Sequence, residues 1–295
     1  MTDAIPQAAT HTPPRRALIV GGGTGLGLAS SLALARRGWR VFLTGRRAER
    51  LQQAQALHPE GLCLWETGDG TDPADVQRVV ASCVKAWGGI DALVVSAGQS
   101  GVGSVLQADL ADLDRVMRAS LWPVFLYSQA VVPHMGASSG TDPVEGQGGA
   151  DASGCDADRV SPPPGDGPHG GAICVIASVT ASVPQPERVA YCSAKAAVVG
   201  MVRQMALDLA PRRIRANTVS PSLVPTELSL GAIARAPDPQ ALLAARVRSH
   251  PIGRIGTAEE IGAAVAWLCS DDAGWVTGQD MVMDGGLSLT AAVPR

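Results

Sequence analysis

A glycine-rich turn between a predicted strand and a predicted helix constrains the fold of this chain most strongly. The apolar run ALIV at residues 17–20 is followed by GGGTGLG and then by the helical pattern LASSLALARRG. The order strand, glycine turn, helix is typical of a dinucleotide-binding motif. In such a motif Gly21 permits a tight turn, Gly25 allows close approach to a pyrophosphate, and Gly27 lets the helix pack on the strand. The helix N-terminus adds unpaired N–H groups and a positive dipole end. The pattern predicts a dinucleotide site, and the alternative is a glycine loop that serves flexibility alone.

The same alternation of strand and helix continues over residues 17–285, so the fold class is α/β. Alternation of this kind predicts a parallel sheet with helices on both faces and ligand sites at the carboxyl ends of its strands. The helix at 190–210 is small or apolar nearly all round, which indicates that a second subunit covers its outer side. Further strands are expected at WRVFLT (39–44), LCLWET (62–67), DALVVSAG (91–98), GAICVIAS (171–178), RIRANTVS (213–220) and QDMVMDGG (279–286), and further helices at 109–135 and 259–271.

Three segments stand apart from this alternation. Residues 1–16 lack a continuous apolar run, and we expect a flexible tail before a single domain over 17–295. Residues 136–170 are rich in Gly, Asp, Ser and Pro and carry five aspartates and one glutamate against one arginine, which predicts a disordered or loosely packed surface insertion. An acidic flap over a neighbouring site is the alternative. Residues 226–250 follow a strand end and form a candidate substrate lid.

The composition excludes several classes of protein. A net charge of −3 gives no basic footprint for nucleic acid. No run of about 18 apolar residues occurs, so no membrane span is expected. The six cysteines are scattered without a C-x-x-C pair, which indicates small core residues in a reducing cytoplasm and no metal site.

The candidate chemistry lies in SVTASVPQPERVAYCSAK, where Tyr191 is followed four residues later by Lys195. On a helix this spacing puts both side chains on one face. A phenol titrates near pH ~10 when free, and a neighbouring ammonium is expected to lower that pKa and make Tyr191 a usable proton donor and acceptor. Ser178 ends an apolar run and could hold a substrate oxygen beside the phenol. The alternative is a solvated helix pair and a strand-end serine.

The end of the second strand bears on the choice of cofactor. Sites for NAD usually place a carboxylate there, and this chain has Gly45 followed by Arg46 and Arg47. Guanidinium groups suit a 2′-phosphate, so NADP is favoured over NAD. The alternative is that RRAER is a charged helix start.

Two further strand ends are candidates for cofactor contact. In the turn GDGTDP, Asp69 is expected to bond the adenine side and Asp72 to cap the helix that starts at Pro73. Ala97 and Gly98 follow another strand, where small residues leave room for a cofactor.

With the glycine motif, the SAG of 96–98, Ser178, Tyr-x-x-x-Lys, PSLVPT (221–226) and WVTGQDMVMDGG (275–286) in this order, the sequence resembles the short-chain dehydrogenase/reductase family. Among its members it resembles the NADP-preferring 3-oxoacyl reductase-like proteins. The resemblance covers nearly all of the chain apart from the tail and the insertion. It implies a three-layer αβα Rossmann-type fold with a parallel seven-stranded sheet of order 3-2-1-4-5-6-7, in a homotetramer or homodimer. The implied activity is hydride transfer between NAD(P) and a carbonyl or secondary alcohol substrate.

The resemblance also implies roles for particular residues. Tyr191 would donate the proton in reduction, Ser178 would bond the substrate oxygen, and Lys195 would bond the nicotinamide ribose. Arg46 stands where NADP-preferring members place a basic residue. The implied cofactor-binding residues are Gly21, Thr24, Gly25, Leu26, Gly27, Arg46, Arg47, Asp69, Gly70, Ala97, Gly98, Tyr191, Lys195, Pro221, Val224 and Thr226.

The sequence departs from the family pattern at several positions. Val20 replaces the usual Thr before the glycine motif, and Val95-Ser96 replaces two Asn residues before Ala-Gly. Ser120 replaces the Asn that holds a water in the proton relay, and we retain Ser120 as a candidate catalytic residue. Ser222 replaces a Gly. These departures motivate two alternatives: an NADP-binding sensor or assembly partner with little catalysis, and an imine or C=C reductase.

Overall fold

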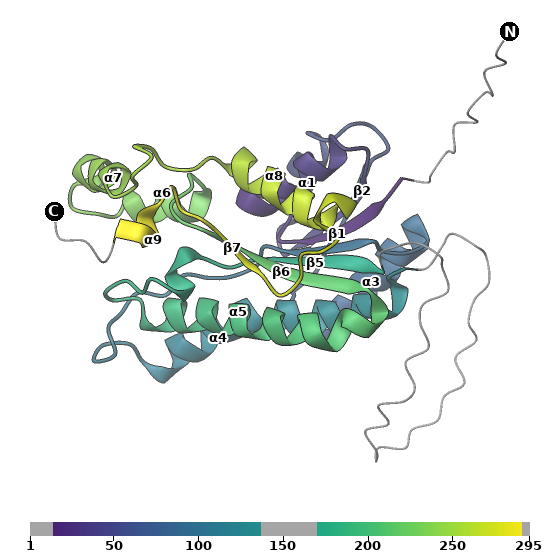
Figure 1. Cartoon of the computed structure of the whole chain (residues 1–295), viewed down its shortest axis with the longest axis horizontal. Coiled ribbons are helices and arrows are strands. Elements are labelled where there is room, and N and C mark those ends of the chain that lie inside the picture. The colour runs from purple at the N-terminus through teal and green to yellow at the C-terminus, as the bar shows by residue number, and fades with distance from the viewer. Residues whose placement is uncertain (1–13, 137–169, 291–295) are drawn as a thin grey trace, which may run out of the picture.

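The fold is a seven-stranded parallel sheet between two helical layers, in a computed structural model that describes residues 14–136 and 170–290 (Figure 1). The strand order is β3-β2-β1-β4-β5-β6-β7, and every neighbouring pair is parallel. The predicted fold class and strand order are therefore confirmed. The strands are β1 (Arg16–Val20), β2 (Arg40–Gly45), β3 (Cys63–Thr67), β4 (Ala92–Val95), β5 (Gly171–Ile176), β6 (Ile214–Pro221) and β7 (Asp280–Met283).

Helices cover both faces of this sheet. Figure 1 shows α4 and α5 side by side along one face, and α1 and α8 together on the other. Three short helices, α6, α7 and α9, gather at one end of the molecule (Figure 1). The helices are α1 (Gly25–Ala35), α2 (Ala48–Gln55), α3 (Pro73–Trp87), α4 (Leu110–Val131), α5 (Val189–Leu209), α6 (Glu227–Ile233), α7 (Pro239–Arg248), α8 (Ala258–Cys269) and α9 (Leu287–Thr290).

The strands sort their side chains between two cores. In β1, Leu18 and Val20 pack into the core under α3, α4 and α5. Ala17 and Ile19 pack into the other core, under α1, α2 and α8. This alternation is the period of two that an extended strand imposes. Because both faces of β1 are covered, its residues 17–20 are all apolar and do not alternate with polar residues.

Most predicted elements lie within a few residues of their observed bounds. The first strand begins at Arg16, one residue inside the predicted tail, because the Arg16 guanidinium and backbone are held by the Asp91 carboxylate at 2.8 Å. Arg15 also has a fixed partner, Asp271, at 2.5 Å. The rest of the predicted tail, over 1–13, and almost all of the predicted insertion, over 137–169, lie outside the described residues.

The order of the strands fixes where a ligand can bind. β1 pairs with β2 on one side and with β4 on the other, so the chain reverses its direction of growth across the sheet at β1. At such a point the connections leave the carboxyl ends of neighbouring strands toward opposite faces and open a crevice between them. Most of the candidate site residues lie at this edge, on loops or in the first turns of α1 and α5, while Pro221 ends β6 and Ser120 lies within α4.

Candidate active site

The glycine turn after β1 forms one wall of a large cleft. Gly21 has a φ of +78° and Gly25 a φ of +55°, conformations that residues with a Cβ rarely adopt. A Cβ on Gly27 would lie 2.2 Å from the carbonyl oxygen of Gly21. The start of α1 is therefore packed directly on the turn, and its unpaired N–H groups face the cleft.

The opposite wall is the end of β4. Ala97 and Gly98 line the cleft, which has a volume of about 820 Å³. A Cβ on Gly98 would lie 3.5 Å from the Lys195 Nζ. A small residue here therefore leaves space in the cleft beside the lysine.

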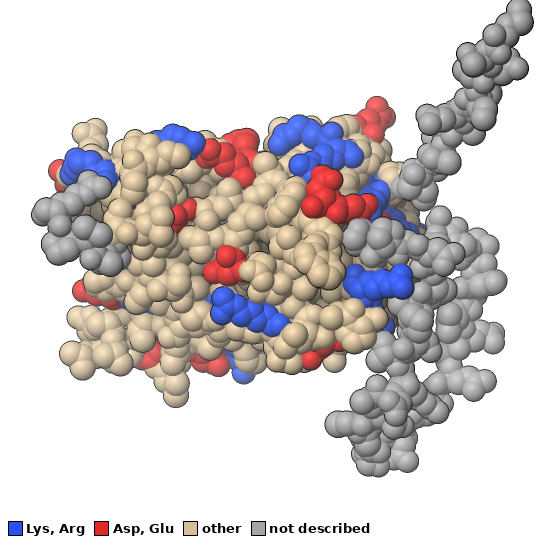
Figure 2. Space-filling model, viewed as in Figure 1, with Lys and Arg blue, Asp and Glu red and all other residues tan. Residues whose placement is uncertain are grey.

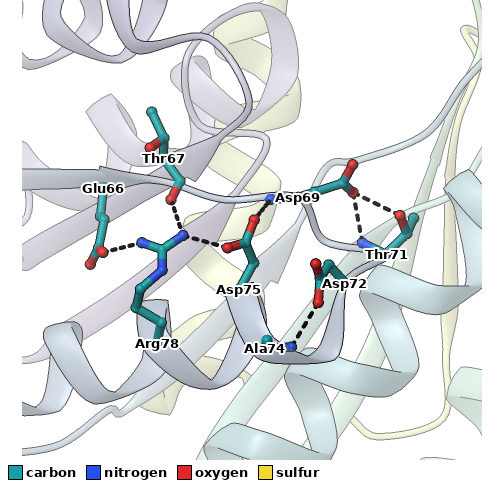
Figure 3. Close-up of polar contacts among 8 residues, drawn as sticks. All are labelled: Glu66, Thr67, Asp69, Thr71, Asp72, Ala74, Asp75 and Arg78. Atoms are coloured by element: carbon teal, nitrogen blue, oxygen red, sulfur yellow. Dashed lines mark hydrogen bonds and ion pairs between the residues drawn. The ribbon is translucent and has the colours of Figure 1, made fainter.

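A third wall is the turn after β3, which a network of polar contacts shapes (Figure 3). The Asp69 Oδ1 accepts hydrogen bonds from the Thr71 N–H at 2.9 Å and from the Thr71 hydroxyl at 2.8 Å. The Asp69 N–H donates to Asp75, whose carboxylate also pairs with Arg78 at 2.6 Å. These contacts lower the pKa of Asp75, so it stays an anion that holds the turn. Asp72 caps α3 by accepting from the Ala74 N–H, as predicted.

The end of β2 is rich in arginine. Arg46, Arg47 and Arg50 line the cleft beside Gly45, with no carboxylate on the strand end itself. Glu227 at the start of α6 reaches across and pairs with Arg47 at 3.2 Å and also with Arg50. Among the described residues, the Arg46 guanidinium has no hydrogen-bond or ion-pair partner.

Nearly all of the predicted cofactor residues lie around this cleft. Gly27 is buried behind the turn, and Pro221 and Val224 line a second cavity next to the cleft. The predicted residues that line the cleft are Gly21, Thr24, Gly25, Leu26, Arg46, Arg47, Asp69, Gly70, Ala97, Gly98, Tyr191, Lys195 and Thr226.

Ser178 and Tyr191 meet where the two cavities join. Tyr191 lines both cavities, and Ser178 lines the second one. The Ser178 Oγ accepts hydrogen bonds from the Thr180 N–H at 3.2 Å and the Thr180 hydroxyl at 3.0 Å. With its lone pairs engaged, the Ser178 hydroxyl is left to donate, and its hydrogen bond acts to lower the pKa of Tyr191.

Lys195 lies one helical turn after Tyr191 and is buried. Its Nζ donates to the Ile176 carbonyl oxygen at 3.0 Å and lies 5.9 Å from the centroid of the Tyr191 ring. Burial lowers the pKa of Lys195 to about 8. The lysine is therefore still mainly protonated at neutral pH, but it loses its proton far more easily than an exposed lysine does.

The prediction that the Lys195 ammonium lowers the Tyr191 pKa is wrong for the groups that the structure describes. Burial is the largest influence and raises the pKa of Tyr191 above its ordinary value, while Ser178 and the positive charge of Arg188 oppose it. The Lys195 Nζ lies over the face of the ring, 5.9 Å from its centroid, and is not among the groups that shift this pKa. The protein side chains alone therefore keep Tyr191 protonated, as a proton donor.

Ser120 lies on α4 behind this group and is almost completely buried. Both its Oγ and the Lys195 Nζ lie within 4 Å of the point where a Cβ on Gly98 would stand. Within residues 14–136 and 170–290 the Ser120 Oγ has no hydrogen-bond partner. A buried hydroxyl group without a hydrogen bond destabilises the folded protein, so we expect a water molecule or a ligand to hydrogen-bond to Ser120 when the enzyme acts.

The second cavity has a volume of about 250 Å³ and lies under the candidate lid. Residues of α6 and α7 form one wall, among them Ile233, Leu242 and Arg246. The buried His250 ties the end of α7 to the loop after β6, with its Nε2 2.9 Å from the Ser222 Oγ. Segment 226–250 therefore contains two helices beside Ser178 and Tyr191.

The sequence reasoning missed several residues of the site. Arg188 lines both cavities and donates to the Ser100 Oγ at 2.7 Å. Thr180 orients Ser178, and Glu227 pairs with the arginines after β2. Arg188 could have been found, because it is a basic residue three positions before Tyr191, and it lies at the N-cap of α5.

The described residues contain neither a cluster of metal ligands nor a membrane-spanning helix. Over residues 14–136 and 170–290, no group of three or more His, Cys, Asp or Glu side chains is arranged to hold a metal ion. None of the described helices combines the length and apolar character that crossing a membrane requires. The free cysteines Cys63, Cys83, Cys174 and Cys269 are buried core residues, as expected, whereas Cys192 is only half-buried and Cys155 lies outside the described residues.

Comparison with known proteins gives the family. A short chain dehydrogenase model matches residues 15–142, and a model described as enoyl-(acyl carrier protein) reductase matches residues 165–288. The chain is 33% identical over 273 residues to 2-(S)-hydroxypropyl-CoM dehydrogenase 3 of Xanthobacter autotrophicus, covering 92% of this chain and 95% of that protein. It is 31% identical to glucose 1-dehydrogenase of Gluconobacter oxydans, covering 93% and 92%.

A solved structure agrees with these relatives. The ligand-free aldohexose dehydrogenase of Thermoplasma acidophilum superposes with a TM-score of 0.74 at 25% identity, covering 96% of this chain and 97% of that one. The chain belongs to the short-chain dehydrogenase/reductase family. It is an oxidoreductase that uses a nicotinamide cofactor and acts on an alcohol or carbonyl group of a small molecule.

Proposed function

We propose that the protein is an NADP-dependent reductase or dehydrogenase of carbonyl and secondary alcohol compounds, with Tyr191 as the acid/base. The supporting observation is the position of Tyr191 at the junction of two cavities, one lined by phosphate-binding elements and the other containing Ser178. A group placed there can exchange a proton with a substrate oxygen that Ser178 holds.

The residues around the cleft fit a dinucleotide. A Cβ on Gly27 would overlap the Gly21 carbonyl, so the turn is shaped to bring backbone N–H groups close to a ligand. Thr24, Gly25 and Leu26 would hold the pyrophosphate, Asp69 and Gly70 the adenine side, and Ala97, Gly98, Pro221, Val224 and Thr226 the nicotinamide side. When bound, NADP supplies or accepts the hydride.

Side chains of the protein would carry out the proton transfer that accompanies hydride transfer. Burial keeps the Tyr191 phenol protonated, so it is ready to donate to a substrate oxygen during reduction. When substrate is bound, the one Ser178 proton would turn from the Tyr191 oxygen to the substrate oxygen and orient it. We propose that Lys195 binds the nicotinamide ribose and, with Ser120 behind it, passes the proton onward to solvent.

The choice of NADP over NAD is supported by the charges at the end of β2. Arg46 and Arg47 lie at the cleft where a carboxylate would otherwise bind ribose hydroxyls. Among the described residues, Glu227 is the one acidic partner of these two guanidinium groups, and it pairs with Arg47. The negative charge of a 2′-phosphate would supply a further partner.

The surroundings of the site carry further proposals. We propose that 226–250 closes over the substrate, because α6 and α7 already line the cavity. Exposed apolar residues on α4 and α5, including Phe125 (54% exposed) and Leu207 (71% exposed), support a homotetramer or homodimer. On the face drawn in Figure 2, acidic and basic groups lie in small patches without a broad basic area, which agrees with the net charge of −3 and supports a small-molecule substrate over nucleic acid. We propose that the enzyme acts in the cytoplasm.

A parallel turnover screen tests this proposal. Purified protein is assayed with NADPH and with NADH against ketones, sugars, steroids and acyl thioesters. We expect carbonyl-dependent oxidation of NADPH that exceeds that of NADH. Tight NADPH binding without turnover on any compound would instead favour a sensor or assembly role, and reduction confined to C=N or C=C bonds would favour the other reductase class.

A further inference from the structure

The second cavity carries positive charge without any matching acid. Its lining includes Arg188 and Arg246, and none of the described residues that line it is an Asp or Glu. The remaining lining is mainly apolar or carries hydroxyl and amide groups, such as Ser100 and Gln185. Two arginines facing a small, partly apolar cavity make its interior electrostatically favourable for an anion.

Arg246 is the less constrained of the two arginines. It projects from α7 and is half-buried, and among residues 14–136 and 170–290 its guanidinium has no hydrogen-bond or ion-pair partner. Its backbone is fixed, since the Arg246 carbonyl oxygen lies 2.6 Å from the His250 Nδ1. A cation that is partly removed from water and has no partner gains from an anionic one.

Arg188 is anchored on one side only. Its Nη1 donates to the Ser100 Oγ at 2.7 Å, while its Nη2 and Nε have no partner among the described residues. The guanidinium lies close enough to Tyr191 for its charge to act on the phenol. Arg188 is therefore placed to bring positive potential to the reacting oxygen, whereas Arg246 lies on the lid wall.

We propose that the substrate is a small oxo acid or hydroxy acid, whose carboxylate or other oxyanion group is held by Arg246 while Arg188 adds positive potential beside Tyr191. The cavity volume of about 250 Å³ is at or below the ~300–1,000 Å³ of ordinary small-molecule sites, so a small substrate fits it better than a large one. This inference specifies the substrate class for the proposed carbonyl reduction and rests on it for its turnover readout.

Matched acids and esters test the inference. The probes are 4-oxopentanoate and its methyl ester, which share the ketone and differ in charge. A charged hydrogen bond is worth about 1.5–3 kcal/mol, so we expect Arg246→Gln to lower kcat/KM for the acid roughly 10- to 100-fold, mainly through KM, and to leave the ester within about 3-fold. Arg246→Lys should retain part of the preference, because it keeps the charge.

Arg248 provides the matched control, since it lies two residues further along α7 and is exposed outside both cavities. Arg248→Gln should leave both substrates unchanged. Equal use of the acid and the ester by the wild type, or an equal effect of Arg246→Gln on both, would overturn the inference.

A binding readout separates this inference from the proposed function. Pentanoate and pentanamide, which cannot be reduced at a ketone, are titrated into the NADPH-loaded protein while its thermal unfolding is followed. We expect pentanoate to raise the unfolding temperature of the wild type and of Arg248→Gln but not of Arg246→Gln, and pentanamide to do so for none of them. That pattern without turnover would uphold the anion site and count against the enzyme proposal, whereas equal behaviour of the two compounds would overturn the anion site itself.

Discussion

Replacing Gly27 by Ala perturbs the packing of α1 on the nucleotide-binding turn. The new Cβ would lie 2.2 Å from the Gly21 carbonyl oxygen, and real Cβ atoms essentially never come closer than 3.0 Å to such an atom, so turn and helix must separate by about 0.8 Å. Overpacking of this kind costs about 1–3 kcal/mol, and the better helix propensity of Ala returns at most about 1 kcal/mol. We expect a net loss of stability of about 1–2 kcal/mol.

The same displacement moves the N–H groups that would face the pyrophosphate. Loss of one hydrogen bond to the charged pyrophosphate is worth about 1.5–3 kcal/mol, so the Kd for NADPH should rise roughly 10- to 100-fold. The assay is titration of NADPH fluorescence, with urea unfolding measured on the same samples.

Gly262→Ala is the matched control for this change. Its Cβ would lie 2.5 Å from the Ala29 carbonyl oxygen, where α8 packs on α1 away from the cleft. It should lose comparable stability and keep its NADPH Kd within about 3-fold of the wild type. Unchanged NADPH binding in Gly27→Ala, or an equal loss in both variants, would refute the reasoning.

Three further changes have expected outcomes. Burial lowers the Lys195 pKa from 10.5 to about 8, so the unfolded chain binds more protons than the folded one between these pH values, and the stability of the wild type rises with pH in that window. Lys195→Met should therefore be about 3 kcal/mol more stable than the wild type below pH 8. Urea unfolding at several pH values should show this advantage shrinking toward pH 10.5. Ser120→Asn should retain or raise turnover, because an amide reaches further than the buried hydroxyl, and a collapse of kcat would show a different role for the serine. Glu227→Gln should tighten NADPH binding several-fold with little effect on NADH, since it releases Arg47 and Arg50, and equal changes for both cofactors would contradict this.

The parts of the structure that were predictable from the sequence rest on local patterns. The glycine turn, the strand ends and the Tyr-x-x-x-Lys spacing depend on residues near one another in the chain, so Gly27, Asp72 and Lys195 lie where the sequence indicates. The contacts that escaped prediction join distant segments. Glu227 meets Arg47 across 180 residues, and no local pattern predicts that pairing.

Burial explains the incorrect prediction about Tyr191. Its helical spacing from Lys195 is as predicted, but spacing does not reveal that the lysine donates to Ile176 or that the phenol is enclosed. The balance between desolvation and nearby charge depends on the packed structure, so the direction of the pKa shift could not be predicted from the sequence.

The central claim is that the Tyr191 phenol donates the proton to the substrate oxygen when the carbonyl group is reduced. The most direct measurement is single-turnover reduction of a ketone by the NADPH-loaded Tyr191→Phe variant, with its NADPH Kd determined in parallel. General acid catalysis contributes about 10²–10⁴-fold, so the account predicts a fall in the rate of that size with the Kd for NADPH within a few-fold of the wild type. A variant that reduces the ketone at the wild-type rate would contradict it.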